Sequence, residues 1–287
     1  MSDAAADGDV LAHVADGVAT ITLNRPDARN MLTSTGMAQL RAQLLAAGED
    51  PAVRVIVLTG TGNTFCSGAD LRGASAADAS SFTGSGPAAL VGVLEAILDN
   101  PKPVIARVQG HVAGGGNGLV AACDLSVAVE SAKFAFSEVR LGLAPAVISV
   151  VCLARMHRAD AQELLLTGER VPAARMAVAG MVNKVVPDAE LDGAVSAWVS
   201  ALQAGGPLAV TATKGLLRDV PGLSRDAGFE HTARLSAELF ASPEAAAGMT
   251  AFLARRPAPW VTEAKAPTPG VRPRHHGDGD GTGASAR

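Results

Sequence analysis

Hydrophobic positions along the chain follow two alternating spacings, one typical of buried strands and one typical of helices. Short apolar runs predict strands over residues 10–14, 18–23, 53–58, 104–108, 125–129 and 134–136. Apolar positions three or four residues apart predict helices over residues 33–47, 88–98 and 117–123. Thr33 or Ser34 is the predicted cap of the first of these helices. Because strands and helices alternate through the first two thirds of the chain, the sequence predicts an α/β core.

From about Leu191 onward the pattern becomes almost purely helical, with predicted helices over residues 194–202, 208–217, 225–240 and 244–253. Residues 263–287 hold Pro, Gly, Asp and Arg with few apolar side chains, which predicts a disordered tail. Residues 1–8 are acidic and polar, which predicts a flexible N-terminus. The predicted organisation is therefore an α/β core over residues 9–195 and a helical region over residues 196–262, between these two ends.

Composition and charge narrow the classes of partner. The chain has 287 residues, 48% of them hydrophobic, and a formal net charge of -4, so it offers no basic face for nucleic acid. The longest apolar run, residues 143–154, is shorter than the roughly 20 residues that span a bilayer. Three cysteines without paired spacing, and an N-terminus unlike a secretory signal, favour a reducing compartment. We therefore expect a cytoplasmic protein with neither nucleic-acid nor membrane partners.

Two loops of small residues each follow a predicted strand. One is Phe65-Cys66-Ser67-Gly68-Ala69-Asp70-Leu71, and the other is Gly114-Gly115-Gly116. Small residues leave backbone N–H groups uncovered, and two such loops brought together can direct two donors at one oxygen atom. That arrangement is an oxyanion hole, which favours chemistry on an activated carbonyl. For the triple glycine taken alone, the alternative is a tight turn.

Glu138 is the one carboxylate within residues 134–139, an otherwise apolar stretch. Burial beside Phe134 and Phe136 would raise its pKa toward the range useful to a general acid or base. The alternative is a surface glutamate that pairs with Arg140 or Arg155. Both interpretations remain open from the residues alone.

Other residues with reactive side chains have weaker patterns. Ser67 and Cys66 are nucleophile types, but no His or Asp partner stands out, so we interpret them as small residues that line a loop. His111 precedes the glycine cluster and could reach a ligand, although a structural role is the simpler interpretation. The sequence contains no metal-ligand spacing, phosphate-binding loop motif or dinucleotide fingerprint.

Taken together and in order, these motifs resemble the crotonase (enoyl-CoA hydratase/isomerase) superfamily. The resemblance covers residues 9–261, and the segments that carry it are Ile21-Thr22-Leu23-Asn24-Arg25-Pro26 with Asn30, Phe65 to Leu71, Gln109 to Gly116, Ala122 to Leu125, Ala132-Lys133-Phe134, Ser137 to Ser149, and Phe252 to Pro257 with Trp260.

The resemblance implies a crotonase-type spiral of ββα repeats over residues 9–195 and a C-terminal helical region that forms a homotrimer or hexamer. It implies an acyl-CoA thioester as substrate, with no cofactor beyond the substrate's coenzyme A and no metal. The thioester oxygen would lie between the N–H groups of Ala69 and Gly115, and Glu138 would match the family's second catalytic glutamate. The residues implied to contact substrate or CoA are Arg29, Ser67, Ala69, Asp70, Leu71, Arg72, Gly114, Gly115, Phe252 and Arg255.

One position departs from the family pattern. The family's first catalytic glutamate is replaced by Gly118, and its neighbour Asn117 would point elsewhere on a helix. Glu138 would then work alone, or with a water molecule or Ser137.

Three functions fit this departure, and we rank them in the order given. The first is hydration of a 2-enoyl-CoA, with Glu138 activating the water. The second is isomerisation of a 3-enoyl-CoA to a 2-enoyl-CoA, for which one carboxylate suffices because no water need be activated. The third is non-catalytic binding of acyl-CoA.

Overall fold

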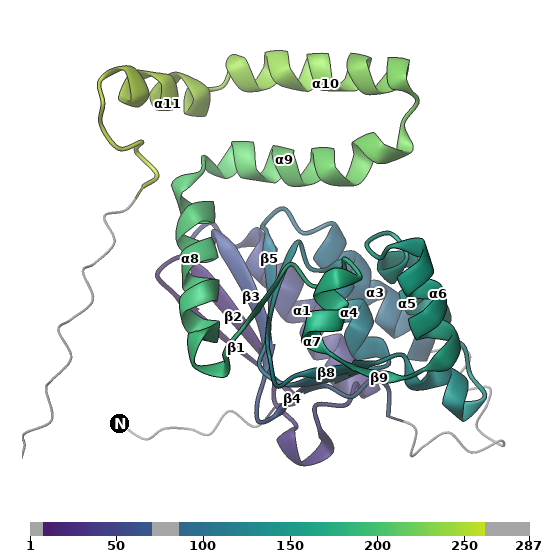
Figure 1. Ribbon diagram of the computed structural model, residues 1–287. Coiled ribbons are helices and arrows are strands. Elements are labelled where there is room, and N and C mark those ends of the chain that lie inside the picture. Colours follow the sequence, from purple (N-terminus) through teal and green to yellow (C-terminus); the bar gives the residue numbers. More distant parts are fainter. Residues whose placement is uncertain (1–7, 71–85, 262–287) are drawn as a thin grey trace, which may run out of the picture.

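The computed structural model of the protein describes residues 8–70 and 86–261, and it contains two β-sheets (Figure 1). The larger sheet has the order β1-β2-β3-β5-β7-β10, formed by Val10–Ala15, Val18–Leu23, Val55–Gly60, Val104–Val108, Leu125–Val129 and Lys184–Val186. The smaller sheet has the order β4-β6-β8-β9, formed by Thr64–Cys66, His111–Ala113, Lys133–Ala135 and Arg170–Pro172. Apart from the antiparallel pairs β1–β2 and β8–β9, neighbouring strands run parallel.

The chain visits the two sheets in turn. Strands β3, β5 and β7 lie in the larger sheet, and the strand that follows each of them, β4, β6 or β8, lies in the smaller one. Helix α3 (Gly86–Leu98) follows the first strand pair and α4 (Gly115–Ala122) follows the second. This is the predicted spiral of ββα repeats, which is confirmed. Because β4, β6 and β8 run parallel, their carboxyl ends meet at one edge of the smaller sheet, and both small-residue loops lie there.

Burial explains why these segments form strands and helices. All six residues of β3 are buried, whereas β2 alternates between buried and partly exposed positions. Helix α1 (Ser34–Glu49) begins after Thr33, whose side chain accepts a hydrogen bond from the Gly36 N–H at 2.9 Å, so Thr33 is the cap. The remaining elements of the core are α5 (Ala146–Cys152), α6 (Arg158–Thr167), α7 (Ala173–Val178) and the 3-10 turns Pro26–Ala28, Ser137–Leu141 and Asp188–Glu190.

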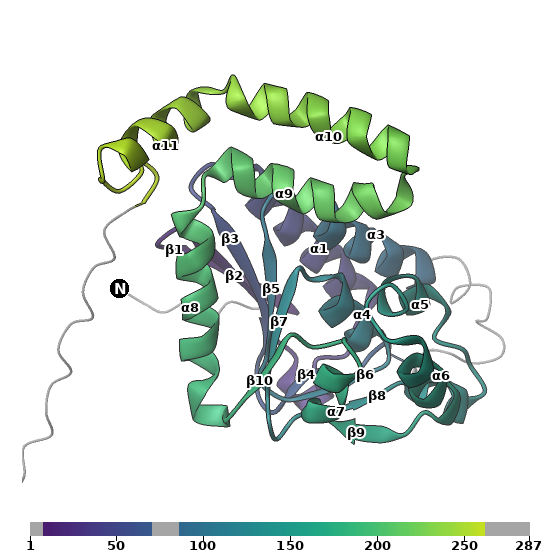
Figure 2. The same cartoon turned by 45° about the horizontal axis from the view of Figure 1, so that its top comes forward.

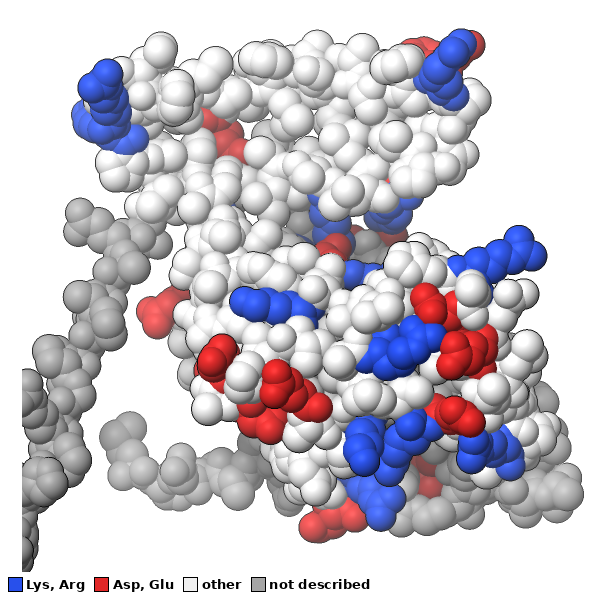
Figure 3. Space-filling view, in the orientation of Figure 1, with Lys and Arg blue, Asp and Glu red and all other residues white. Residues whose placement is uncertain are grey.

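The C-terminal helices form an arm beside the two sheets. Helix α8 (Leu191–Ala204) packs against β3, β5 and β7, and α9 (Pro207–Asp219), a 3-10 turn at Val220–Gly222, α10 (Arg225–Phe240) and α11 (Pro243–Leu253) follow. Figures 1 and 2 show α9 between α10 and the core, with α10 and α11 farthest out. The arm exposes apolar side chains, with Phe229 and Phe240 each 70% exposed, and Figure 3 shows few charges over it on the side displayed. Such a face is typical of an interaction surface.

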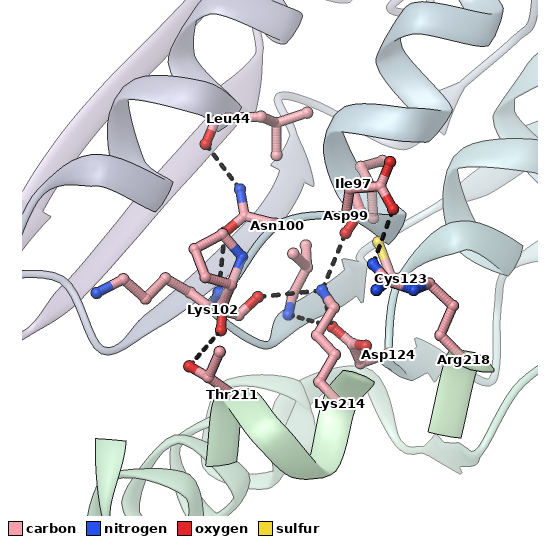
Figure 4. A network of polar contacts seen from close by, with 12 residues as sticks. Leu44, Ile97, Asp99, Asn100, Lys102, Cys123, Asp124, Thr211, Lys214 and Arg218 are labelled. Carbon is pink, nitrogen blue, oxygen red and sulfur yellow. Dashed lines mark hydrogen bonds and ion pairs between the residues drawn. The ribbon is translucent and has the colours of Figure 1, made fainter. Parts of the chain in front are cut away.

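A polar network attaches α9 to the core (Figure 4). The ammonium of Lys214 lies 2.8 Å from a carboxylate oxygen of Asp124 and donates hydrogen bonds to the carbonyls of Ile97 (2.9 Å) and Lys102 (3.1 Å). The same oxygen of Asp124 accepts a hydrogen bond from the Val104 N–H at 2.7 Å. Lys214 is 10% exposed, so all three of its donors are used in a largely dry setting.

Replacing Lys214 by Met should lower the free energy of unfolding by about 3 kcal/mol, because the Asp124 carboxylate would lose its counter-ion. Urea unfolding would measure the change. Arg218→Met is the matched control, because both side chains of the Arg218–Asp99 ion pair are exposed. That pair should contribute no more than about 1 kcal/mol to stability. Equal effects of the two substitutions would contradict an anchoring role for Lys214.

The sequence predicted the long elements correctly, with small shifts at their ends, but it missed the short strands β4, β6, β9 and β10 and the helices α5, α6 and α7. The strand expected over residues 53–58 is Val55–Gly60, and the helix expected over residues 117–123 begins at Gly115. The predicted flexible N-terminus and disordered tail, apart from Gly8, lie outside the described residues. Within the described ranges no helix is long and apolar enough to cross a membrane.

Candidate active site

A cavity of about 680 Å³ opens where the carboxyl ends of the small-sheet strands meet the helices. Its polar side is formed by the two small-residue loops and by Glu138. Its apolar side comes mainly from the starts of α1, α3 and α5 and from the segment after β8, with lining residues that include Leu32, Met37, Leu90, Leu141, Leu143, Val147 and Ile148. The cavity therefore combines a few polar groups with an apolar wall, as small-molecule sites commonly do.

The two loops touch through their glycines. A Cβ atom added to Gly68 would lie 3.2 Å from both the Gly114 Cα and the Gly115 nitrogen. Gly68 has φ 92° and Gly114 has φ 51°, conformations that favour glycine. The glycines thus allow the Ala69 and Gly115 segments to approach closely at one wall of the cavity.

Hydrogen bonds fix the first loop but leave one of its donors unused. The N–H of Leu32 donates to the Gly68 carbonyl at 2.8 Å, and the N–H of Asp70 donates to the Leu32 carbonyl at 3.1 Å. Ala69 between them is exposed and pairs with Leu32 as an isolated bridge. Among residues 8–70 and 86–261, no acceptor binds the N–H of Ala69 or that of Gly115, the first residue of α4. Both amides thus remain available to a ligand.

Glu138 lines the same cavity as these amides, in the 3-10 turn Ser137–Leu141 that follows β8 rather than at the end of the strand itself. Its Oε1 atom is 3.7 Å from the position of a Cβ atom on Gly114. Its Oε2 atom is buried and finds no partner within the described part of the chain. Burial raises the pKa of this carboxyl above its ordinary value of 4.5, and the hydrogen bond from its own N–H offsets the shift only in part.

The alternative in which Glu138 forms a surface ion pair is wrong. The guanidinium of Arg140 donates to the Thr167 carbonyl. The guanidinium of Arg155 donates to the carbonyls of Ala121 and Cys123 and to other acceptors nearby. Neither forms a salt bridge with Glu138 in the residues described, so the carboxylate keeps its lone pairs for the cavity.

The position of the missing glutamate is filled by an apolar side chain. A Cβ atom added to Gly118 would lie 2.5 Å from Cγ2 and 3.0 Å from Cβ of Ile148, which projects from α5. The Ile148 side chain therefore occupies the space that a side chain at position 118 would need. No room is left there for a carboxylate beside the present Ile148. Asn117 does not substitute for it, because its amide nitrogen donates to the carbonyls of Gly114 and Ala135.

The structure places five of the ten predicted contact residues in the cavity lining. Ser67, Ala69, Asp70, Gly114 and Gly115 line the cavity. Arg29 is exposed next to it, and its carbonyl accepts a hydrogen bond from the Ser67 N–H at 3.1 Å.

Four predicted contacts remain. Phe252 and Arg255 lie at the end of the C-terminal arm, outside the cavity lining of this single chain, and Phe252 is 81% exposed. Leu71 and Arg72 lie outside the described residues.

The other candidate reactive side chains of the described residues, Cys66, Cys152 and His111, are not activated. Burial raises the pKa of the Cys66 and Cys152 thiols to about 12, so both stay protonated near neutral pH. For Cys152, the negative charge of Glu138 adds to the effect of burial. His111 lies on β6, where its Nδ1 accepts a hydrogen bond from the Lys133 N–H at 3.2 Å, as a structural role predicts.

Two features of the site could not be predicted from the sequence. Ile148 belongs to an unremarkable apolar run, and only the packing of α5 against α4 places it over Gly118. The hydrogen bond of Asn117 to the Ala135 carbonyl joins residues 18 positions apart, and no local pattern predicts it.

Comparison with known proteins agrees with this fold. The family model described as enoyl-CoA hydratase/isomerase matches residues 13–263. A probable enoyl-CoA hydratase of Rhizobium meliloti is 37% identical, over 84% of this chain and 93% of its own. A 2,3-dehydroadipyl-CoA hydratase of Escherichia coli is 34% identical, over 83% of this chain and 93% of its own. The crystal structure of an enoyl-CoA hydratase of Mycobacterium smegmatis superposes with a TM-score of 0.82 at 34% identity, covering 89% of this chain and all of that one.

The fold and the cavity define a crotonase-type α/β enzyme. The chain belongs to the enoyl-CoA hydratase/isomerase family, a family of hydro-lyases and related enzymes.

Proposed function

We propose that the protein hydrates the 2,3 double bond of a 2-enoyl-CoA, with Ala69 and Gly115 as the oxyanion hole and Glu138 as the sole acid/base group. The observation that carries the proposal is the pair of unused amides beside a desolvated carboxylate in one cavity. Hydratases among the relatives support the reaction type. The reaction draws on no cofactor beyond the substrate's own CoA.

In the proposed first step, the Glu138 carboxylate takes a proton from water while the water oxygen bonds to C3. The π electrons of the C2–C3 bond shift toward the thioester, and the negative charge that forms on its oxygen is held by the two amides. The proton on Glu138 then passes to C2, and the thioester carbonyl re-forms. Gly115 is the first residue of α4, so the positive end of that helix adds to the stabilisation of the oxyanion.

Isomerisation is the second candidate, and the packing of Ile148 over Gly118 favours it. A second carboxylate is absent there, so the attacking water would have one protein base to orient it. In the isomerase reaction, Glu138 would take a proton from C2 of a 3-enoyl-CoA and return it to C4 through the same oxyanion. Incubation with 2-enoyl-CoA and 3-enoyl-CoA separates the two reactions, because only hydration adds the mass of a water molecule to the product.

The pH dependence of kcat/KM should report Glu138. The group must be ionised to act as a base, so activity should fall as pH drops through its raised pKa, at a higher pH than the ordinary value of 4.5 would give. Steady-state rates measured across pH in buffers of constant ionic strength would show this acidic limb. A rate that stays constant down to the ordinary glutamate range would exclude Glu138 as the base.

Restoring a glutamate at position 118 should fail unless Ile148 is reduced. Gly118→Glu alone should destabilise the protein by about 1–3 kcal/mol through overpacking and should not raise hydration. Gly118→Glu combined with Ile148→Gly makes room, and its rate of hydration should exceed that of either single variant. Thermal unfolding and hydration assays on the four proteins would measure the coupling. If the two substitutions had additive effects on stability and on the rate of hydration, the side chains at positions 118 and 148 would not compete for the same space.

We further propose that the apolar arm packs against other copies of the chain in a trimer or hexamer, which would bring Phe252 and Arg255 to a neighbouring cavity. The exposed apolar side chains of α10 and α11 support this assembly. The phosphates of CoA are proposed to lie near Arg29, which is exposed beside the Ser67 loop. Sedimentation of the wild-type protein and of Phe229→Asp would test the assembly, since only the wild-type protein should be trimeric or larger.

A further inference from the structure

Asn117 is a fully buried polar residue in the first turn of α4, directly behind the glycine loop. Its amide nitrogen donates to the Gly114 carbonyl at 3.2 Å and to the Ala135 carbonyl at 2.8 Å. Because both neighbours are acceptors, the orientation of the amide group is unambiguous. Its Oδ1 atom is buried without a partner among the described residues. Burying a polar atom without a hydrogen-bond partner costs free energy, so the presence of Asn117 here calls for an explanation.

The first bond acts on the oxyanion hole. The Gly114 carbonyl and the Gly115 N–H belong to one peptide group, and in a trans peptide the two point in opposite directions. The Asn117 side chain and the Asn117 backbone N–H (2.9 Å) both hold that carbonyl. Holding the carbonyl therefore aims the Gly115 N–H away from α4, and Gly115 lines the cavity.

The second bond acts on the base. Ala135 is the last residue of β8, three positions before Glu138, and its carbonyl accepts from both the Gly114 N–H (3.2 Å) and Asn117. One amide group therefore joins the peptide that carries the oxyanion donor to the strand that leads to the carboxylate. A shift of about 1 Å between such groups can cost 10²-fold in rate.

We propose that Asn117 is a positioning residue that sets the distance and direction between the Gly115 N–H and Glu138. The inference rests on the proposed function, since it assumes that these two groups act on one acyl-CoA. Asn117 does not reach the cavity itself, because it is fully buried and is not part of the cavity lining.

Asn117→Leu tests the proposal with little structural cost. Leu has the same branching and the same number of side-chain heavy atoms as Asn, and both carbonyls keep a backbone donor, from the Asn117 position to Gly114 and from Gly114 to Ala135. The unpaired Oδ1 atom also disappears. We expect kcat to fall by about 10- to 100-fold, with little change in KM or melting temperature.

The matched control is Asn100→Leu. Asn100 is also buried and donates to two carbonyls, those of Leu44 and Ala96, but it is not part of the cavity lining, and its Oδ1 accepts from the Lys102 N–H (Figure 4). This variant should lower the melting temperature and leave the kcat of the folded protein unchanged.

A second readout separates this inference from the proposed function. A 2,4-dienoyl-CoA absorbs at longer wavelength when hydrogen bonds polarise its carbonyl, so bound probe reports the oxyanion hole without turnover. The wild-type protein should shift the absorbance to the red, and Asn117→Leu should reduce that shift. If the wild-type protein shifts the probe but turns over neither 2-enoyl- nor 3-enoyl-CoA, the proposed function fails, and loss of the shift in the variant still supports the positioning role. Wild-type kcat and an unchanged shift in Asn117→Leu would overturn the inference, as would a loss of rate that only parallels a fall in melting temperature.

Discussion

Glu138→Gln should reduce turnover of acyl-CoA by about 10²–10⁴-fold, the typical contribution of a general acid/base. The glutamine has nearly the same shape but cannot accept and return a proton, so binding of the CoA ester should be retained. Stopped-time assays of turnover, together with calorimetric titration of a non-reactive acyl-CoA, would separate the two effects. Glu130→Gln is a suitable control because that residue is exposed at the end of the larger sheet. Turnover near the wild-type rate would remove Glu138 from the mechanism.

The same substitution has a consequence for stability. The pKa of Glu138 is raised in the folded state, so the folded protein holds this proton more tightly than the unfolded chain does. The ionised group therefore destabilises the fold once the pH exceeds the unfolded pKa, and this destabilisation is complete above the folded pKa. Glu138→Gln should match or exceed the wild-type melting temperature at neutral pH, and the advantage should vanish in acid. A variant that is both inactive and less stable at neutral pH would contradict the desolvated state of Glu138.

Gly115→Pro should reduce kcat/KM by about 10²–10³-fold, the cost of removing one oxyanion donor. Proline is tolerated at the first position of a helix, and Gly115 holds that position in α4, so the fold should survive. Gly115→Ala keeps the N–H, and its added carbon would lie 3.3 Å from a methyl group of Leu32. This second variant measures the cost of the extra carbon alone.

The difference between the proline and alanine variants is the informative quantity. Circular dichroism would first establish that both are folded, and steady-state kinetics on the same acyl-CoA would then be compared. The proline variant should be at least about tenfold slower than the alanine variant, since only the proline lacks the donor. Equal rates in two folded variants would mean that the Gly115 amide does not contact the thioester.

Much of this architecture could be predicted because it depends on local pattern. Apolar runs predicted strands such as Leu125–Val129 with the correct bounds. The bounds of the helix Arg225–Phe240 were also predicted correctly. The glycines at 68 and 114 marked the loops because only glycine adopts their backbone angles easily. The short strands β4, β6, β9 and β10 were missed, since three residues carry too little periodicity to stand out from their surroundings.

The parts of the site that escaped prediction depend on contacts between distant segments. Whether Glu138 pairs with an arginine or faces a cavity is decided by where Arg140 and Arg155 find carbonyl acceptors, which the sequence does not reveal. The loss of space at Gly118 follows from the packing of α5 on α4. The helical arm was predicted, and its exposed apolar side chains fit the proposed assembly with other copies of the chain.

In the proposed mechanism, main-chain amides at positions 69 and 115 hold a thioester oxyanion while Glu138 moves the proton. The most direct test is incubation of the wild-type protein with a 2-enoyl-CoA in ¹⁸O-labelled water, followed by mass spectrometry of the CoA esters. We predict a 3-hydroxyacyl-CoA that carries one labelled oxygen, formed at a rate that collapses in both Glu138→Gln and Gly115→Pro. Formation of the labelled product at the same rate by the two folded variants would contradict the account, as would a wild-type protein that binds the ester and incorporates no label.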